Sequence, residues 1–145
     1  MAEKDERHHI FSTMEKRFGI PESLFDEYLL FRKKKSWWLL KDSPLILSTC
    51  RLKISFAGLK AFQRVGQFLK PTTRWVQIFG RYASRGLVDI GEDQFQELLK
   101  GEFLAFESRM ENGYVILTLD GGTLGLGLLI HGRIRSQLPM KRLLL

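Results

Sequence analysis

The chain has 145 residues, of which 44% are hydrophobic and 12% aromatic, so it can bury a core in one domain or in two small ones, and extensive disorder is excluded. Its 23 lysines and arginines outnumber 16 acids and give a formal charge of +7. The sequence has no apolar run of membrane-spanning length, no signal-peptide core, and a single cysteine, Cys50, which excludes an internal disulfide. We therefore expect a soluble, cytoplasmic protein with no membrane partner.

The positive charge is concentrated in one segment. Residues 32–85 hold 13 lysines and arginines and one acid, Asp42, whereas residues 86–131 carry a net charge of −6. Such a basic field is typical of a protein that binds a polyanion such as nucleic acid. A solvated basic face that only maintains solubility is the alternative interpretation.

The first residues lack an obvious core-forming pattern. Residues 1–16 are polar and mixed in charge, and we predict that they form a mobile tail. The adjacent His8 and His9 have no third ligand beside them, so solvated histidines are favoured over a metal site. From Pro21 onward the spacing predicts a short helix with one apolar stripe, formed by Leu24, Phe25, Tyr28 and Leu29.

Four consecutive cations, residues 32–35, precede a predicted strand over residues 36–40 that places Trp37 and Trp38 on opposite faces. An exposed tryptophan beside these cations has two interpretations, stacking on a base or covering apolar surface. Residues 51–57 alternate as a second strand with a cationic outer face. That face carries Arg51 and Lys53.

A helix is predicted after Pro71, because two threonines follow it and Trp75, Val76, Phe79 and Tyr82 then form a helical stripe. The loop over residues 69–74 brings Lys70 and Arg74 next to hydroxyl groups and free helix N–H groups. This combination predicts a phosphate site, although a hydroxyl that caps a helix is routine.

The last third of the chain predicts a small sheet. Residues 86–90 form a connector or a strand, residues 92–100 a helix ended by Gly101, and residues 103–106 the first strand of the final sheet. Strands over 114–119 and 124–130 follow, joined at 120–122, and a turn at His131 and Gly132 leads into a third strand. This third strand alternates, with Ile134, Ser136 and Leu138 on one face and Arg133, Arg135 and Gln137 on the other.

The glycine-punctuated strands carry a resemblance. The pattern Gly-Tyr-Val, Asp-Gly, Leu-Gly-x-Gly and Gly-Arg-x-x-Ser-x-x-Pro, between Gly113 and Pro139, resembles the PUA-like RNA-binding domain appended to bacterial ribosomal-RNA cytosine-5 methyltransferases. It resembles more distantly the ribosome-assembly factors built from a pre-PUA and a PUA domain. The resemblance extends upstream through residues 54–104. It implies structured RNA, either rRNA or tRNA, as the partner, with an RNA-modifying enzyme or a pre-ribosomal particle alongside.

The sequence does not indicate catalysis. A methyltransferase needs a doubly wound sheet with a glycine-rich cofactor loop, and no helix is predicted directly after Gly125 and Gly127 that would complete one. Thr49 and Cys50 resemble the nucleophile dipeptide of cytosine-5 enzymes, but without the catalytic domain a structural thiol is favoured. We therefore expect no enzyme activity, no cofactor and no metal.

Together these patterns predict an α+β protein, with a basic N-terminal α/β half followed by a PUA-like β pseudobarrel. The expected parts are a mobile tail (1–16), a basic pre-PUA-like domain (17–85) and a PUA-like RNA-binding domain (86–145). The expected function is non-catalytic binding of structured RNA in ribosome biogenesis or RNA modification. A protein-interaction module that docks through the tryptophans and residues 143–145 is the alternative. The expected RNA-binding residues are Lys33, Lys34, Lys35, Arg51, Lys53, Lys70, Arg74, Arg133, Arg135, Gln137 and Lys141.

Overall fold

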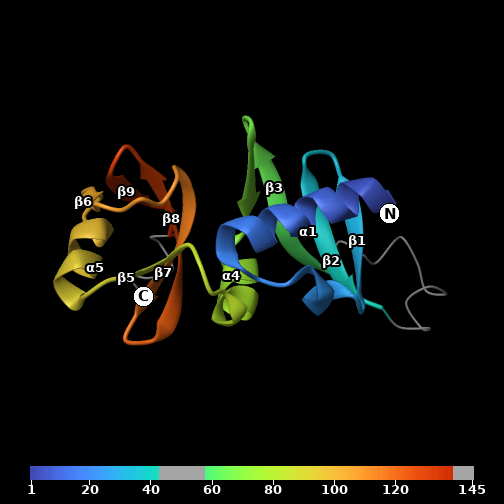
Figure 1. Ribbon diagram of the computed structural model, residues 1–145, viewed down its shortest axis with the longest axis horizontal. Coiled ribbons are helices and arrows are strands. Elements are labelled where there is room, and N and C mark those ends of the chain that lie inside the picture. Colours follow the sequence, from blue (N-terminus) through green and yellow to red (C-terminus); the bar gives the residue numbers. More distant parts are fainter. Residues whose placement is uncertain (43–57, 139–145) are drawn as a thin grey trace.

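A computed structural model describes residues 1–42 and 58–138 and contains two sheets with a helix between them (Figure 1). The N-terminal sheet is antiparallel and has the strand order β1-β2-β3-β4. Its strands are β1 (Tyr28–Lys33), β2 (Ser36–Lys41), β3 (Leu59–Val65) and β4 (Phe68–Pro71). Helix α1 (Lys4–Phe18) lies across this sheet, and a short 3₁₀ helix, η1 (Glu22–Phe25), connects the two (Figure 1).

The C-terminal sheet has the order β5-β7-β8-β9-β6 and curls into half of a barrel. Its strands are β5 (Leu87–Asp89), β6 (Leu104–Ala105), β7 (Gly113–Leu119), β8 (Gly122–Ile130) and β9 (Arg133–Ser136). Only the β5–β7 pair among these is parallel. Helix α4 (Thr73–Phe79) and the 3₁₀ helix η2 (Gly80–Tyr82) lie between the sheets, and α5 (Glu92–Leu99) covers the far side of the second (Figure 1). The α+β fold with a C-terminal pseudobarrel is therefore confirmed.

The turns of the C-terminal sheet form where the sequence predicts them. Asp120 and Gly121 have φ values of 51° and 79°, and His131 and Gly132 have φ values of 49° and 77°. Two successive residues with positive φ match the right-handed twist of the strands that they join. These turns make β8 a central strand that pairs with β7 on one side and β9 on the other.

Helix α5 also follows its sequence signals. The Gln94 side chain accepts a hydrogen bond from the Gly91 N–H at 2.9 Å, which satisfies one free donor at the start of the helix. At the other end Gly101 has a φ of 84°, and its N–H donates to the Leu98 carbonyl at 3.0 Å. The helix thus begins and ends as its sequence requires.

Two apolar clusters hold the elements together. The larger contains α1, η1, the N-terminal sheet and α4, with Trp75 fully buried among phenylalanines, and it extends to Tyr114, Ile116 and Leu126 of the C-terminal sheet. The smaller lies between α5 and the opposite face of the C-terminal sheet. The two sheets therefore share one core.

Two predictions for the N-terminal region are wrong. Residues 1–16 are not a mobile tail, because Lys4–Phe18 form α1 and bury Ile10, Phe11, Met14 and Phe18. This stripe supplies the packing that stabilises the helix, although polar residues outnumber apolar ones. The helix predicted after Pro21 is only one 3₁₀ turn, since residues 28–31 are strand formers that pair with β2.

The end of α1 is attached to the segment that precedes the C-terminal sheet. The N–H groups of Ser84 and Arg85 both donate to the Phe18 carbonyl, at 2.8 and 3.0 Å, and the Arg85 guanidinium donates to the Glu15 carbonyl at 2.8 Å. In return the Arg17 Nε donates to the Tyr114 carbonyl at 2.7 Å. The predicted boundary between residues 85 and 86 stays a prediction. None of the described helices is both long and apolar enough to cross a membrane.

Candidate nucleic-acid interface

One face of the C-terminal sheet changes from core to surface along its length. Opposite residues in an antiparallel pair point to the same face, and Tyr114, Leu128 and Arg135 occupy one such row across β7, β8 and β9. Tyr114 belongs to the larger core, Leu128 is half-buried and Arg135 is exposed. In the next row Ile130 pairs with Arg133, and both are exposed. The predicted alternation of β9 is confirmed, because Ile134 between the arginines is fully buried.

Strand β4 of the other sheet meets this face. The Lys70 Nζ donates to the Gln137 Oε1 at 3.1 Å and lies 5.8 Å from the centre of the Tyr114 ring. The Phe68 ring approaches the same tyrosine edge-on, with 6.3 Å between centroids, and is 53% exposed. Burial raises the pKa of the Tyr114 phenol. We call the set Phe68, Lys70, Tyr114, Arg135 and Gln137 the β4–β9 surface.

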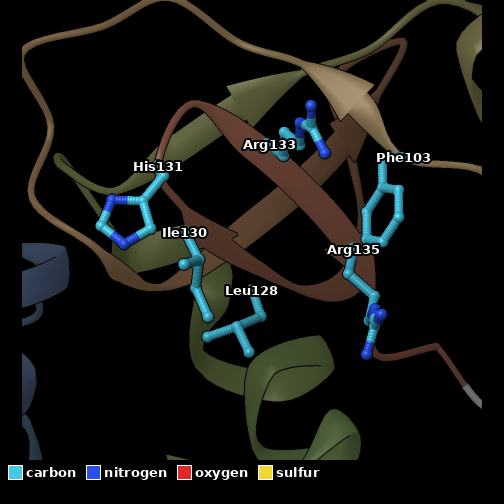
Figure 2. A pocket seen from close by; sticks show the side chains of 6 residues that line it. All are labelled: Phe103, Leu128, Ile130, His131, Arg133 and Arg135. Carbon is cyan, nitrogen blue, oxygen red and sulfur yellow. The ribbon is translucent and has the colours of Figure 1, made fainter.

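A pocket of about 480 Å³ opens beside this surface (Figure 2). We call it the β8–β9 pocket, and it is lined by Phe103, Leu128, Ile130, His131, Arg133 and Arg135. The Arg135 guanidinium lies 5.0 Å from the centre of the Phe103 ring, a cation–π contact. Within residues 1–42 and 58–138, neither arginine of the pocket forms an ion pair. Both can therefore contact an external anion.

The cations of the first basic run lie elsewhere. Lys33, Lys34 and Lys35 are exposed at the β1–β2 turn, where Lys34 has a φ of 57°. Strand β3 separates this turn from β4, so the lysines lie outside the β4–β9 surface. A link exists at the strand tips, since the Arg64 N–H donates to the Lys35 carbonyl at 2.8 Å and Val65 pairs with Phe68. In Figure 1 the β1–β2, β3–β4 and β8–β9 turns lie along the same upper edge.

Trp37 favours packing over base stacking. It is 2% exposed, its Nε1 donates to the Glu6 Oε1 at 2.8 Å, and Arg32 and Arg64 lie 5.6 and 5.7 Å from its ring. Trp75 is fully buried, and Trp38 is half-buried. Trp37 and Trp75 are therefore core residues.

In the predicted phosphate loop, the Thr72 hydroxyl group is already hydrogen-bonded within the protein. The Thr72 Oγ1 accepts from the Trp75 N–H at 3.2 Å and donates to the Lys60 carbonyl at 2.6 Å. Arg74 is exposed in the first turn of α4, whereas Lys70 is directed to Gln137. Phosphate binding at this loop stays a prediction, and Thr72 acts as an ordinary helix cap.

Several expected residues are outside the described ranges. Arg51, Lys53, Lys141 and Cys50 fall there, and so do the leucines at 143–145. The structure thus brings together Lys70, Arg133, Arg135 and Gln137 of the predicted set. Among the described residues, no group of three or more His, Cys, Asp or Glu side chains has the arrangement of a metal site.

Sequence reasoning missed the aromatic part of the site. Phe68, Phe103 and Tyr114 accompany the cations, and Phe103 is 49% exposed, although the sequence pattern indicates only that it starts a strand. The sequence signal that could have pointed to Phe103 was an aromatic residue at the start of a very short predicted strand. Its neighbour Leu104 pairs with Ile134, and this long-range pairing places Phe103 beside Arg135.

A second basic cluster was also missed. A pocket of about 840 Å³ is lined by Lys16, Arg17 and Arg85 together with Glu111 and smaller side chains. Burial lowers the pKa of Arg17, and the Glu111 carboxylate opposes this shift. Because Arg17 and Arg85 donate to backbone carbonyls, this cluster has a structural role in joining α1 to the C-terminal sheet.

Comparison with known proteins identifies the C-terminal segment. Residues 85–144 match the family described as the PUA domain of methyltransferase RsmF. This segment is therefore similar to a PUA domain of the RsmF type. The resemblance drawn from the motifs between Gly113 and Pro139 is therefore confirmed, and the β8–β9 pocket lies within the PUA domain.

Curated relatives carry the same domain within longer chains. Ribosomal RNA small subunit methyltransferase F of Aeromonas hydrophila subsp. hydrophila is 29% identical over 112 residues, which cover 76% of this chain and 23% of the relative. The protein of the same name from Psychromonas ingrahamii is 27% identical over 118 residues, which cover 77% of this chain and 24% of the relative. The chain thus spans about a quarter of the length of these relatives. Both alignments are longer than segment 85–144, so they include residues outside the PUA family match.

Proposed function

We propose that this chain is an RNA-binding module that holds structured ribosomal RNA through the β4–β9 surface and the arginines of the β8–β9 pocket. The proposal is carried by one observation: Lys70 of the N-terminal sheet contacts Gln137 and Tyr114 on the face of the C-terminal sheet that also bears Arg135, in a segment similar to a PUA domain. Arginines and lysines neutralise phosphates, and exposed aromatic side chains stack on bases. A surface that offers both fits RNA better than a protein partner.

The relatives' name supports ribosomal RNA of the small subunit as the target class. We propose that the module acts in RNA modification or ribosome assembly and lends affinity to a methyltransferase activity. Transfer RNA is the alternative structured target. The alignment covers less than a quarter of the first relative, so we further propose that residues 1–145 bind RNA without catalysing its methylation.

The docking alternative is less well supported. A docking module should present its large aromatic side chains, yet Trp37 and Trp75 are buried, and the exposed Phe68 packs edge-on against Tyr114, over whose ring Lys70 lies. The exposed Ile130 of the C-terminal sheet is bordered by Arg133 and Arg135. This mixture of charge and apolar area favours a polyanionic partner.

The test is the salt dependence of binding to a structured fragment of small-subunit ribosomal RNA. The double variant Arg133→Ala/Arg135→Ala should bind more weakly at every salt concentration, and the slope of log K against log salt should fall by about one unit for each phosphate that the variant no longer neutralises. The matched control is Lys100→Ala/Arg109→Ala, which removes the same charge at exposed positions outside the surface and the pocket. Circular dichroism checks that both variants are folded.

Two outcomes decide between specific contacts and general charge. A reduced slope in the Arg133/Arg135 variant with a wild-type slope in the control supports the proposal. Equal slopes in both folded variants would show that this surface does not contact RNA. A transfer RNA, measured in parallel, separates the two target classes, since the tighter of the two identifies the preferred one.

A further inference from the structure

The β8–β9 pocket combines an apolar interior with a cationic rim. Figure 2 shows Leu128 and Ile130 between His131 on one side and Phe103 on the other, with the two arginines at the margin. A phosphate group alone needs only charge and N–H donors and gains nothing from the apolar side chains. The pocket therefore fits a ligand that has a flat apolar part as well as a negative charge.

Phe103 is placed as a stacking surface and not as a core residue. It is 49% exposed and belongs to neither apolar cluster, whereas its neighbour Leu104 is buried. The guanidinium of Arg135 lies over its ring at 5.0 Å and restricts its orientation. Aromatic rings and guanidinium planes are the two groups on which proteins stack unpaired bases.

The β8–β9 turn directs a third planar side chain to the same place. His131 has a φ of 49°, and its backbone N–H donates to the Asn112 Oδ1 at 3.0 Å, which holds the turn from the β7 side. Its imidazole lines the pocket opposite Phe103 (Figure 2). The imidazole offers both a stacking face and ring nitrogens that can hydrogen-bond to a base edge.

We infer that the β8–β9 pocket takes one unpaired nucleobase, which stacks on Phe103 above Leu128 and Ile130 while the adjoining phosphates contact Arg133 and Arg135. This inference rests on the proposed RNA binding and specifies the form of RNA. A base inside a continuous helix cannot reach such a pocket, because its faces are covered by its neighbours. The module should therefore prefer RNA with a bulge or an open loop over uninterrupted duplex.

The experiment uses three RNA hairpins of one sequence, measured with the full chain. One is fully paired, one has a single bulged 2-aminopurine nucleotide, and one has a bulge that lacks the base. Wild-type protein should bind the base-containing bulge about tenfold more tightly than either of the others, in line with the usual effect of one stacked base. Binding should also quench the 2-aminopurine fluorescence, because the fluorophore stacks.

Variants of two exposed aromatic residues, Phe103 and Tyr82, assign the effect to the pocket. Phe103→Ala should lose the preference for the base-containing bulge and the quenching, and Phe103→Trp should keep both. The matched control is Tyr82→Ala, which removes an aromatic side chain of similar exposure, 42%, outside both the pocket and the β4–β9 surface and should keep the preference. Thermal unfolding of each variant excludes loss of the fold as the cause.

The outcomes separate this inference from the proposed function. If all three RNAs bind equally and Arg133→Ala/Arg135→Ala weakens each, RNA binding stands and base insertion is overturned. Equal binding of the two bulged RNAs would likewise overturn it, since backbone flexibility alone would then explain the preference. If none of the three RNAs nor the ribosomal fragment binds, the proposed function itself fails.

Discussion

The two faces of the C-terminal sheet are built from the same strands but are covered differently. On one face Val115, Leu117, Leu129 and Ile134 pack under α5, and every buried member of that cluster is aliphatic. On the other face α4 and β4 cover only part of the strands, and the remainder carries Leu128, Ile130, Arg133 and Arg135. Adjacent residues of one strand therefore alternate between the core under α5 and the partly uncovered face.

The difference shows how a short strand can be both structural and functional. In β9 the side chain of Ile134 is fully buried, and the arginines on either side of it point to the open face. Because successive side chains alternate, cations can be changed on one face without disturbing the aliphatic packing on the other. Stability and binding should consequently respond to different substitutions.

The largest effect is expected on the covered face. Leu98 of α5 is fully buried in the smaller cluster, and Leu98→Ala should lower the free energy of unfolding by about 2–5 kcal/mol, because it removes apolar packing and leaves a cavity. Urea unfolding measures the change. On the open face Ile130→Ala is the counterpart, since Ile130 is 44% exposed, and it should change stability by less than about 0.5 kcal/mol. Equal losses for both would contradict the distinction between the faces.

A smaller loss is expected where the sheet lacks room for a methyl group. A Cβ at Gly127 would lie 2.8 Å from the Cγ2 of Ile134 and 3.3 Å from the Cγ2 of Val115. Gly127→Ala should therefore lower stability by about 1–3 kcal/mol through overpacking of the α5 side. Gly122→Ala in the same strand is the control, because the nearest atom to its Cβ is 3.5 Å away. The two unfolding curves should differ, and coincident curves would show that Ile134 moves aside without cost.

The smallest effect depends on pH and concerns Tyr114, which lies on the same face as Arg135 but is buried where Phe68 and Lys70 of β4 contact it. Burial raises the phenol pKa, so the folded state retains this proton at a pH where the unfolded chain has begun to lose it. This contribution to stability is complete below about pH 10 and is lost as pH rises through the folded pKa. Wild type should therefore lose more stability than Tyr114→Phe between pH 9 and pH 11, as followed by urea unfolding. Parallel losses would mean that the phenol is not desolvated.

In the C-terminal half, the features that depend on residues close together in sequence were predicted correctly. The features that depend on long-range contacts were not predicted. The caps of α5, the turns at Asp120 and His131, and the alternation of Arg133 and Arg135 all depend on residues close together in sequence, and these elements formed as predicted. The β8–β9 pocket depends instead on the pairing of β6 with β9, about 30 residues apart, which brings Phe103 to Arg135. No local pattern contains that information.

The N-terminal errors have a different physical origin. In α1 four apolar side chains among many polar ones lie on one stripe, and composition alone concealed the helix. After Pro21 the cap signal was correct for one turn only, because pairing of Tyr28–Lys33 with β2 prevailed over continuation of the helix. Tertiary contacts decided both segments. The lysines at 33–35 are likewise separated from β9 because of the strand order, which cannot be read from local sequence patterns.

The reciprocal hydrogen bonds between the end of α1 and the PUA domain affect how this domain can be exchanged between proteins. Arg17 donates to Tyr114, Arg85 donates to Glu15, and the core beneath them includes Ile116 and Leu126. A gene fusion that transferred only residues 85–144 would carry away half of a shared hydrophobic interface and leave its aliphatic side chains in water. The segment that matches the family is thus smaller than the packed unit, and we expect α1 and the N-terminal sheet to accompany it when it is transferred to another protein.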